Sequence, residues 1–451
     1  MIINDRISDY LSKKPVSFHM PGHKGREIGG DISACSASFS FPRNLIEYDV
    51  TEIDETLNIY ETGKLNERLF KETAKLFGAR MTLYSCGGAT LAIQAALFTV
   101  AAGKTVICCT DAHVSVENAF ALSSIIPVYT DNIDSELLEK FHPAAVFICT
   151  EDYYGRINTS RTAELASVCK AYGIPLVCDN SHGTHLAFHD NVSLHPLTLG
   201  ADIVIDSAHK TLPVLTGGAF LHLTGEYAEN WKEFITSLKL FATTSPSYLI
   251  ARSLEQAVYF MHSESKALTT LSELCNIVKS VVRQKDGIFY EDIGIFSDPY
   301  RITVIAANAI EIDTVLKKHG VFSEFSNENH IVLIPSVMNT ESDFDKLISA
   351  LNEVEIIPMN NKEKDLLLKN YSVKEKIIIP ELSPRDAVLS RKKTVFLRDS
   401  IGMIAAAPVY KYPPAVPLLH IGEKIKSEHI SVLAGICDTV TVVDENYMKK
   451  D

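Results

Sequence analysis

The sequence predicts an α/β protein whose largest domain is built around a mostly parallel β-sheet. Short apolar runs alternate with longer amphipathic stretches through the middle of the chain. This alternation is typical of βαβ units, because strands that helices cover on both faces carry near-continuous apolar runs. The chain has 451 residues, which is too many for one core and enough for two or three domains.

Five apolar runs predict strands of this sheet, namely Thr105–Cys109, Ala145–Thr150, Ile174–Asp179, Ile203–Asp206 and Ala219–Leu223. Amphipathic stretches predict helices at Glu61–Phe77, Thr90–Ala102, Val114–Leu122 and Thr162–Tyr172. Residues 1–50 are rich in Pro, Gly and His and are expected to form an N-terminal arm. The large domain is therefore expected to span residues 51–283.

The second half of the chain predicts smaller units. One long helix is expected from Ser247 to about Val282, as a connector. A small α+β domain is expected over residues 284–359, and a charged linker followed by a C-terminal domain over residues 360–451. Within the small domain, strands are expected at Arg301–Ala306 and His330–Pro335, and helices at Ile312–His319 and Ser342–Glu353.

Composition excludes several classes of function. Hydrophobic residues make up 46% of the chain and charged residues 22%, with no apolar run long enough to span a bilayer and no export signal at the N-terminus. The nine cysteines lack a repeated C-x-x-C spacing, which favours reduced thiols in the cytoplasm over a disulfide framework. The net charge of −13 argues against nucleic-acid binding. We expect a cytoplasmic protein with neither nucleic acid nor membrane as its partner.

The stretch Ala201–Gly218 places one lysine, Lys210, beside apolar runs. Lysine is rarely buried as an ammonium, and an imine to a cofactor aldehyde would remove most of the desolvation cost. The alternative is an ordinary lysine on an exposed turn after a strand.

Asp179 ends one predicted strand, and Lys210 follows the next predicted strand along the chain. Because ligands of open α/β sheets bind at the carboxyl ends of strands, an acid and a lysine there match a pyridoxal-phosphate site. The lysine would form the Schiff base, and the acid would keep the pyridine nitrogen protonated. Taken alone, Asp179 is also consistent with a helix N-cap.

A phosphate site is predicted at a small-residue turn between a strand and a helix. Backbone N–H groups and the helix dipole favour an anion at such a turn. Ser207 and His209 stand next to Lys210 and are candidates for further donors. The turn comprises Ser85, Cys86, Gly87 and Gly88.

Histidines provide two further hypotheses. His113 follows a predicted strand, where its ring is a candidate to stack on the cofactor, although it is also consistent with an ordinary loop histidine. His182, His185 and His189 have spacings of three and four residues that suggest a metal site. Gly183 makes the aligning helix unfavourable, so no metal is predicted.

Several motifs along nearly the whole chain together resemble one known family. Among them, Pro21-Gly-His-Lys24 and Ser207-Ala-His-Lys210 are the most specific. In this order the motifs resemble those of the prokaryotic ornithine/lysine/arginine decarboxylases, which are fold-type-I pyridoxal-phosphate enzymes. The remaining matches are Asp49–Asp54, His113, Tyr153–Gly155, Asp179–His182, Phe241–Tyr248, Ser383–Ala387 and Tyr412–Pro417.

The resemblance implies a fold-type-I large domain, a small α+β domain and a C-terminal decarboxylase-type domain, without the wing domain of the larger relatives. It also implies a role for each matching residue. Lys210 would bind the cofactor covalently, Asp179 would pair with the pyridine nitrogen, and His113 would stack on the ring. His182 would lie at the phenolic edge, while Ser207, His209 and the turn Ser85–Gly88 would hold the phosphate.

The chain departs from the family pattern in three places. The phosphate turn is Leu83–Gly88 instead of the usual Asn-Gly-Thr/Ser sequence, and Asn180-Ser181 replaces Glu-Ala. In the C-terminal domain, Tyr412–Pro417 and His420–Glu423 replace Pro-Pro-Gly-Ile-Pro and Pro-Gly-Glu.

The expected activity is decarboxylation of lysine, arginine or ornithine, with a role in polyamine metabolism. The alternatives are another fold-type-I reaction, such as that of an aminotransferase, lyase or aldolase, and a degenerate homologue that binds the cofactor without turnover. A homodimer or a higher homo-oligomer is expected, with the arm around His19–Lys24 reaching the neighbouring subunit. Candidates to bind the substrate side chain are Glu52, Asp54, Asp152 and Glu423.

Overall fold

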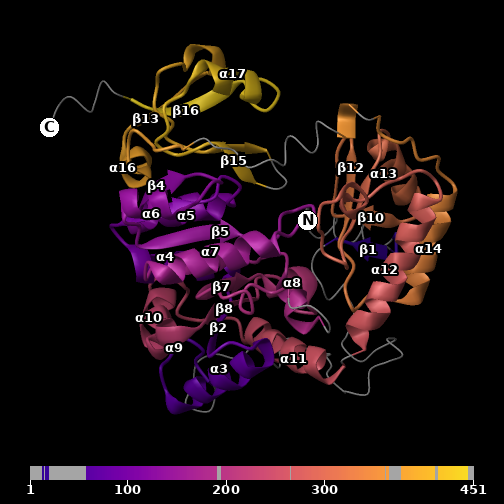
Figure 1. The fold of residues 1–451 in the computed structure, drawn as a ribbon, viewed down its shortest axis with the longest axis horizontal. Coiled ribbons are helices and arrows are strands. Elements are labelled where there is room, and N and C mark those ends of the chain that lie inside the picture. The colour runs from indigo at the N-terminus through magenta and orange to yellow at the C-terminus, as the bar shows by residue number, and fades with distance from the viewer. Residues whose placement is uncertain are drawn as a thin grey trace.

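The structure is a computed structural model of the 451-residue chain. It describes residues 13–14, 16–19, 57–189, 194–264, 266–360, 362–364, 377–411 and 415–444. Figure 1 shows three groups of elements: a central sheet with its helices, a smaller unit beside it, and a C-terminal unit at one edge of the sheet.

The central sheet has seven strands in the order β2-β8-β7-β6-β5-β3-β4. Neighbours from β7 to β4 are parallel, and β8 is antiparallel to both β7 and β2. The predicted α/β class with a mostly parallel sheet is confirmed. The strands are β2 (Met81–Ser85), β3 (Thr105–Cys108), β4 (Ile126–Tyr129), β5 (Ala145–Cys149), β6 (Leu176–Asp179), β7 (Ile203–Asp206) and β8 (Ala219–Leu223).

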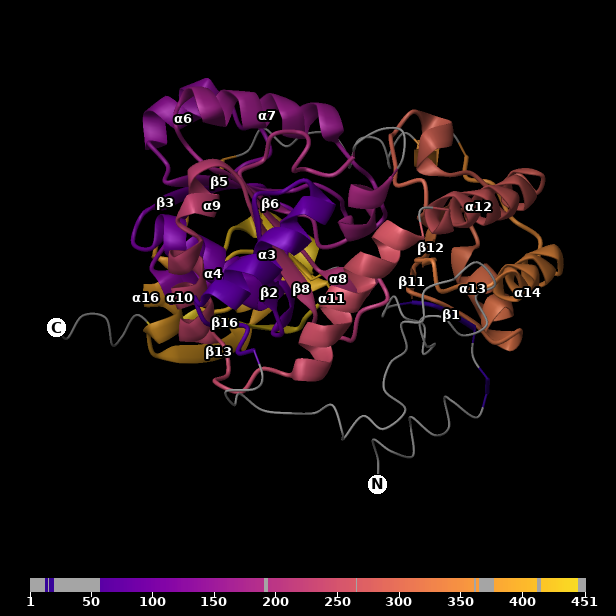
Figure 2. The same ribbon diagram turned by 90° about the horizontal axis from the view of Figure 1, so that it is seen from below.

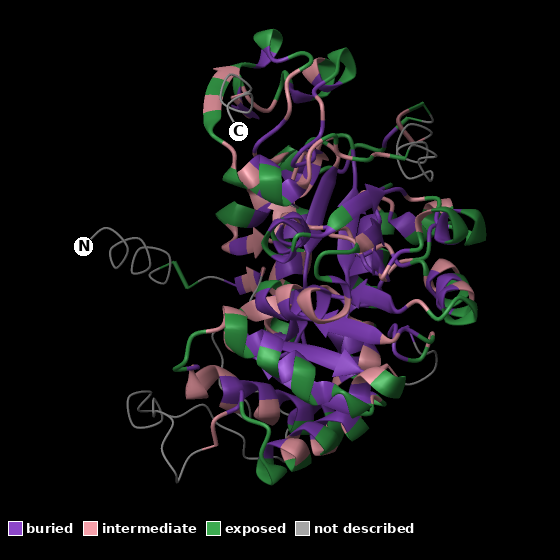
Figure 3. Ribbon diagram, turned by 90° about the vertical axis from the view of Figure 1, so that its left-hand side faces the viewer, coloured by how far each residue is buried: buried purple, intermediate pink, exposed green. Residues whose placement is uncertain are grey.

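Helices lie on both faces of this sheet, as parallel strands with apolar side chains on both sides require. Figure 2 shows α6 and α7 on one side of the sheet and α4 and α10 on the other. Figure 3 shows the strands buried and the outer helical surfaces exposed. The helices are α3 (Lys64–Phe77), α4 (Gly88–Ala101), α5 (Val114–Ser123), α6 (Ser135–Phe141), α7 (Thr159–Ala171), α8 (Ala208–Thr211), α9 (Gly225–Glu229) and α10 (Trp231–Phe241).

The prediction of a single connector helix from Ser247 to about Val282 is wrong. The structure has two helices, α11 (Tyr248–Ser263) and α12 (Ala267–Arg283), and α12 packs on α14 (Glu341–Asn352) of the smaller unit. The sequence around the break, His262-Ser-Glu-Ser-Lys266, carries no apolar side chain that would continue the buried face of a helix.

The smaller unit contains an antiparallel sheet in the order β11-β12-β9. Strand β1 (Val16–Phe18), from the expected arm, pairs in parallel with β10 (Val321–Ser323) of this unit. The domain boundaries set out above stay a prediction. The other elements are β9 (Ile302–Ile305), α13 (Ala309–Lys318), β11 (Phe325–Ser326), β12 (His330–Leu333) and α14 (Glu341–Asn352).

The C-terminal unit consists of two small antiparallel sheets and short helices. Helix α16 packs on α5 of the central unit. Within the described residues, no helix is both long and apolar enough to cross a membrane. The elements are α16 (Pro384–Leu389), β13 (Lys392–Phe396), β14 (Val409–Lys411), β15 (Val416–Leu419), α17 (Ser427–Leu433) and β16 (Thr439–Val443).

A buried carboxylate connects the C-terminal unit to the central unit. Glu117 of α5 accepts hydrogen bonds from Tyr129 Oη at 2.6 Å, His420 Nδ1 at 2.6 Å and the Ile421 amide at 3.0 Å. The His420 ring also stacks on Tyr129, with 3.9 Å between the ring centroids. His420, one of the departures from the family pattern, is therefore part of this contact.

Candidate active site

A cavity of about 460 Å³ lies at the carboxyl ends of the parallel strands. The central unit supplies most of its wall, the smaller unit contributes Glu324 and the C-terminal unit contributes Val416. Because parallel strands all end at the same edge of a sheet, residues that follow different strands meet there. The cavity therefore brings together His113 after β3, Asp179 at the end of β6 and Lys210 after β7.

Lys210 faces a histidine across the cavity floor. Its Nζ lies 3.0 Å from His182 Nε2. Desolvation lowers the pKa of Lys210, although the charge of Asp179 opposes this shift. Burial, and then the charges of Lys210 and Arg301, hold the pKa of His182 well below its usual value. A neutral His182 can therefore accept a hydrogen bond from Lys210, and the lowered pKa of Lys210 favours the neutral amine that attacks an aldehyde.

Asp179 presents a buried carboxylate to the same cavity. One oxygen, Oδ1, accepts hydrogen bonds from the amide and the hydroxyl of Ser181. These two bonds orient the carboxylate, whose second oxygen makes no hydrogen bond with the described residues. Asp179 can thus hold a cationic or N–H group of a molecule in the cavity.

His113 is the N-cap of α5. Its Nδ1 accepts from the Ser115 amide at 3.1 Å and lies 2.9 Å from Ser115 Oγ. Burial lowers the pKa of His113, opposed by Asp179 and assisted by Lys210. The ring is therefore held in one orientation and is neutral, which suits stacking on a flat ligand.

The predicted phosphate turn reaches the cavity only in part. Gly88 lines it together with Ala89 and Thr90, whereas Ser85, Cys86 and Gly87 are not among the described lining residues. Ser85 Oγ instead donates to the Gly88 carbonyl at 2.8 Å. The Cys86 amide donates to Tyr60 Oη at 3.1 Å. The Gly88 amide donates to the Gly217 carbonyl at 2.7 Å, so the donors available to an anion here are the next amides of α4, which lack partners within the helix.

Ser207 and His209 line the cavity as expected from their position beside Lys210. His209 Nδ1 lies 3.1 Å from the Gly218 carbonyl and 3.4 Å from Ser207 Oγ. Since a carbonyl only accepts, Nδ1 carries the proton in this contact. Burial lowers the pKa of His209, with the Gly218 carbonyl opposing the shift.

Sequence reasoning missed Glu151, which is buried in the cavity wall just after β5. Its Oε1 pairs with Arg301 Nη2 at 2.8 Å, and its Oε2 is buried without a hydrogen-bond partner among the described residues. Burial, reinforced by the charge of Asp298, raises the pKa of Glu151 well above its usual value. The rule that found Asp179, an acid at the end of an apolar run, would also have found Glu151.

Glu324 was also missed, and nothing in its local sequence indicates a site. It enters the cavity from the smaller unit, where its Oε1 accepts from Tyr153 Oη at 2.8 Å. The Tyr153 ring contacts His182 edge to face, with centroids 5.5 Å apart. Tyr153 therefore joins the smaller unit to the Lys210–His182 pair.

The structure describes two of the four acidic residues that are candidates to bind the substrate side chain. Asp152 lines the cavity, but its carboxylate contacts the Arg156 guanidinium and the amides of Tyr154 and Arg156. Glu423 is buried in the C-terminal unit, with its Oε2 on the His420 amide and its Oε1 3.3 Å from His429 Nε2. Glu52 and Asp54 lie outside the described residues, as does Pro21–Lys24 of the arm motif.

The three histidines considered for a metal site point to different partners. His182 faces Lys210, while His185 Nε2 lies 3.1 Å from Asp298 Oδ2. His189 contacts the ring of Tyr300. The 3₁₀ helix at Thr184–Phe188 does not align the three rings as an α-helix would.

Comparison with solved structures agrees with the observed fold. Lysine decarboxylase A from Pseudomonas aeruginosa superposes with a TM-score of 0.71 at 16% identity, covering 90% of this chain and 75% of that one. The Francisella novicida lysine decarboxylase LdcF gives a TM-score of 0.69 at 16% identity, covering 86% and 73%. A Sphingomonas wittichii serine palmitoyltransferase, over 66% of this chain and 78% of that one, reaches 0.51 at 13% identity. The expected fold-type-I architecture is confirmed.

Sequence comparison provides the family. An uncharacterized protein of Bacillus subtilis, YaaO, is 26% identical over 96% of this chain and 94% of its own length. An arginine decarboxylase of the same organism is 26% identical over 95% and 91%. The family described as "Orn/Lys/Arg decarboxylase, major domain" matches residues 3–141 and 135–335. The chain therefore belongs to the Orn/Lys/Arg decarboxylase family and is, by that membership, an amino acid decarboxylase.

Proposed function

We propose that this protein uses pyridoxal 5'-phosphate to decarboxylate a basic L-amino acid, which is lysine, arginine or ornithine. The observation that carries the proposal is the meeting of Lys210, Asp179 and His113 in one cavity with the start of α4. Relatives named arginine decarboxylase and lysine decarboxylase support the substrate class. The product amines would connect the protein to polyamine metabolism.

The residues of the cavity fit this cofactor. Lys210 supplies the amine for the aldehyde, and Asp179 has a carboxylate oxygen available for the pyridine N–H. His113 presents a flat neutral ring. Anion donors are at hand in the Ala89 and Thr90 amides at the start of α4 and in the Thr90 and Ser207 hydroxyls.

The chemistry that pyridoxal phosphate supplies when bound is an electron sink for the bond that releases CO₂. The protein orients the substrate and places charges around it. Lys210 Nζ, which lies 3.0 Å from the neutral His182 Nε2, would hold the proton that the substrate Cα receives after CO₂ leaves. Asp179 keeps the ring nitrogen protonated, so that the sink stays cationic.

We assign recognition of the cationic substrate side chain to Glu324. This carboxylate enters the cavity from the smaller unit and is oriented by the Tyr153 hydroxyl. Glu151 and Asp152 also line the cavity, but each contacts an arginine. An ammonium or guanidinium at the end of the substrate would gain a charge-assisted hydrogen bond from the Glu324 carboxylate.

The two alternative functions gain no specific support. An aminotransferase would use an arginine to hold the substrate carboxylate, but Arg301 faces Glu151 and the Tyr153 carbonyl and is absent from the described cavity lining. The degenerate homologue was suggested by changes in the phosphate turn and at His420. Within Ser85–Gly88 only Gly88 is among the described lining residues, and His420 and Ile421 lie in the contact with Glu117.

The test is an assay of amine and CO₂ release on purified protein with added pyridoxal phosphate. Lysine, arginine and ornithine would be offered beside a panel of other amino acids. We expect one basic amino acid to yield its amine, with no turnover by Lys210→Ala. Formation of a keto acid, or CO₂ release by Lys210→Ala, would contradict the proposal.

We also propose a homodimer, because fold-type-I sites of this kind are completed by a second subunit. Light scattering after size-exclusion chromatography should give twice the chain mass of 49.8 kDa. A monomer with full activity would contradict this part of the proposal.

A further inference from the structure

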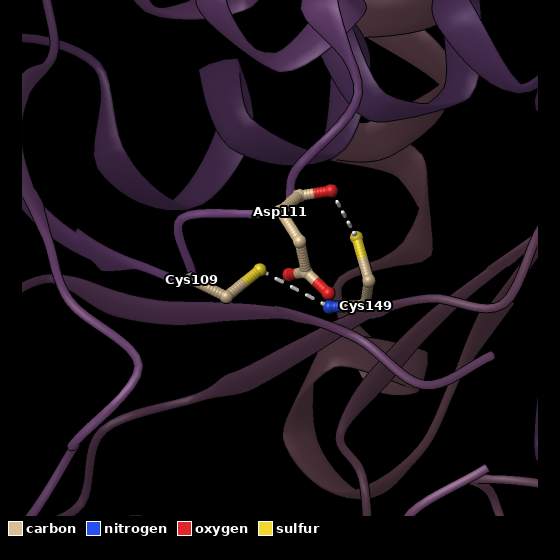
Figure 4. A group of neighbouring side chains, drawn as sticks. All are labelled: Cys109, Asp111 and Cys149. Carbon is tan, nitrogen blue, oxygen red and sulfur yellow. Dashed lines mark hydrogen bonds between the residues drawn. The ribbon is translucent and has the colours of Figure 1, made fainter. Parts of the chain in front are cut away.

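A second group of reactive side chains lies in the wall of the same cavity. Cys109 and Asp111 follow β3, and Cys149 ends β5, as Figure 4 shows. Strands β3 and β5 are parallel neighbours, with Cys108 opposite Phe147. Their carboxyl ends therefore bring these three side chains together, and the proposed reaction uses none of them.

The three side chains are close enough to share one ion. The two sulfur atoms and one Asp111 carboxylate oxygen all lie within 4.8 Å of one another. The Cys149 amide donates to Cys109 Sγ at 3.3 Å, and Cys149 Sγ donates to the Asp111 carbonyl at 3.8 Å. Both cysteines are free thiols. An N–H donor aimed at a sulfur stabilises that sulfur as a thiolate, which is the form that binds metals.

The group is also accessible. Asp111 is exposed, Cys149 is half-buried, and both line the cavity, while Cys109 is buried behind them. A dissolved ion would meet the carboxylate first and the two sulfurs next. An entry path of this kind is one requirement of a functional metal site.

The chemistry of the donor set selects a thiophilic cation. Zinc prefers tetrahedral sites with Zn–S distances of about 2.3 Å and Zn–O distances of about 2.0–2.2 Å. Two thiolates on one such ion are about 3.8 Å apart, so the donors would have to approach by at most about 1 Å. Magnesium and calcium prefer oxygen donors throughout, so two sulfurs disfavour them.

We propose that Cys109, Asp111 and Cys149 form a zinc site in the wall of the active-site cavity. Binding forms two Zn–S bonds and one Zn–O bond and releases the two thiol protons to solvent. Water fills the fourth position, on the cavity side. A further consequence, which rests on the proposed function, is that bound zinc inhibits decarboxylation by narrowing the cavity that Asp111 and Cys149 line together with Lys210.

The other close group of donors in the described part of the chain does not compete with this site. His195 and His222 each direct Nε2 at Asp206 Oδ2, at 2.9 and 3.0 Å, and all three are fully buried. Their hydrogen bonds satisfy one another, and burial leaves an ion no path to them.

The first test is zinc binding to the cofactor-loaded, full-length protein under reducing conditions, measured by competition with a chromophoric chelator. Cys149→Ser and Asp111→Asn remove one donor each. Cys437→Ser, a partly exposed cysteine of the C-terminal unit, is the matched control. We expect one tight equivalent in the unmodified protein and in the control, and affinity weakened about 100-fold or more by Cys149→Ser. Equal affinity in Cys149→Ser would overturn the site.

X-ray absorption at the zinc edge supplies a readout that does not depend on activity. Two sulfurs at about 2.3 Å and lighter donors at about 2.0–2.2 Å are expected. A shell of nitrogen and oxygen alone would place zinc at the histidines or the cofactor and overturn the proposal. Since binding and the absorption spectrum are read without turnover, an inactive protein would contradict the proposed function and leave this test intact. Inhibition that persists in Cys149→Ser would overturn the inhibitory role.

Discussion

Glu117→Gln should loosen the C-terminal unit without changing the size of the side chain. The Glu117 carboxylate is buried and accepts from Tyr129 Oη, His420 Nδ1 and the Ile421 amide. A glutamine retains one acceptor oxygen but directs an NH₂ group at the remaining donors. At least one buried donor is then left without a partner, which costs about 1–3 kcal/mol, and the charge that strengthens the other bonds is lost. Together, the unpartnered donor and the lost charge should lower the free energy of unfolding by about 3 kcal/mol.

Hydrogen exchange measured by mass spectrometry can read this loss locally. A cost of about 3 kcal/mol should raise exchange in the peptides of β13–β16 on the order of 100-fold, with little change in the central sheet. Because Val416 lines the cavity, KM should rise as well. Glu61→Gln is the control, since the Glu61–Lys239 pair is about half exposed and should change stability by less than 1 kcal/mol. Unchanged exchange in Glu117→Gln would refute the reasoning.

Three further predictions concern single residues. Asp179→Asn should retain the fold, measured by circular dichroism, and lower kcat on the order of 100-fold or more, because the sink loses its charge partner; near-normal turnover would exclude this role. Ala415 stands where the family pattern has glycine and has φ 63°, so Ala415→Gly should raise the unfolding free energy by about 0.5–1 kcal/mol in urea titrations, and a loss of stability would contradict strain there. Burial alone would raise the pKa of Asp298, but His185 and Arg301 hold it at about 2. Because the pKa of Asp298 is lower in the folded chain than its value near 4 in the unfolded chain, the ionised carboxylate stabilises the fold at pH values above about 4. This contribution should be lost as the pH falls from about 5 to 2. The stability difference between the unmodified protein and Asp298→Asn should shrink over that window, and a constant difference would argue against the linkage.

Local sequence patterns predicted most of the large domain. All five expected strands are present, with ends within two residues of the expectation, because apolar runs bounded by polar turns report burial directly. The same reasoning brought Lys210, Asp179 and His113 to one edge of the sheet, since each follows a predicted strand. The direction of a strand could not be predicted in the same way, because nothing in the Ala219–Leu223 run reveals that β8 is antiparallel to its neighbours.

The phosphate turn illustrates where local reasoning ended. Its glycines correctly indicated a strand-to-helix turn, but the sequence could not tell which groups of the turn face the cavity. Ser85 turns its hydroxyl back to Gly88, and the Gly88 amide donates to the Gly217 carbonyl at 2.7 Å. Gly217 is distant along the chain, so the local sequence could not predict that it takes up the Gly88 amide.

The sequence alone determined the α/β class and the family, and it predicted the residues that are proposed to bind pyridoxal phosphate, because these follow from periodicity and from side-chain types in a recognisable order. Tertiary structure decided the rest of the cavity. Glu324 reaches it from the smaller unit and Val416 from the C-terminal unit, and the ends of β3 and β5 bring Cys109 and Cys149 together. These contacts join residues that are remote in sequence, so only packing of the three units and pairing of the strands could establish them.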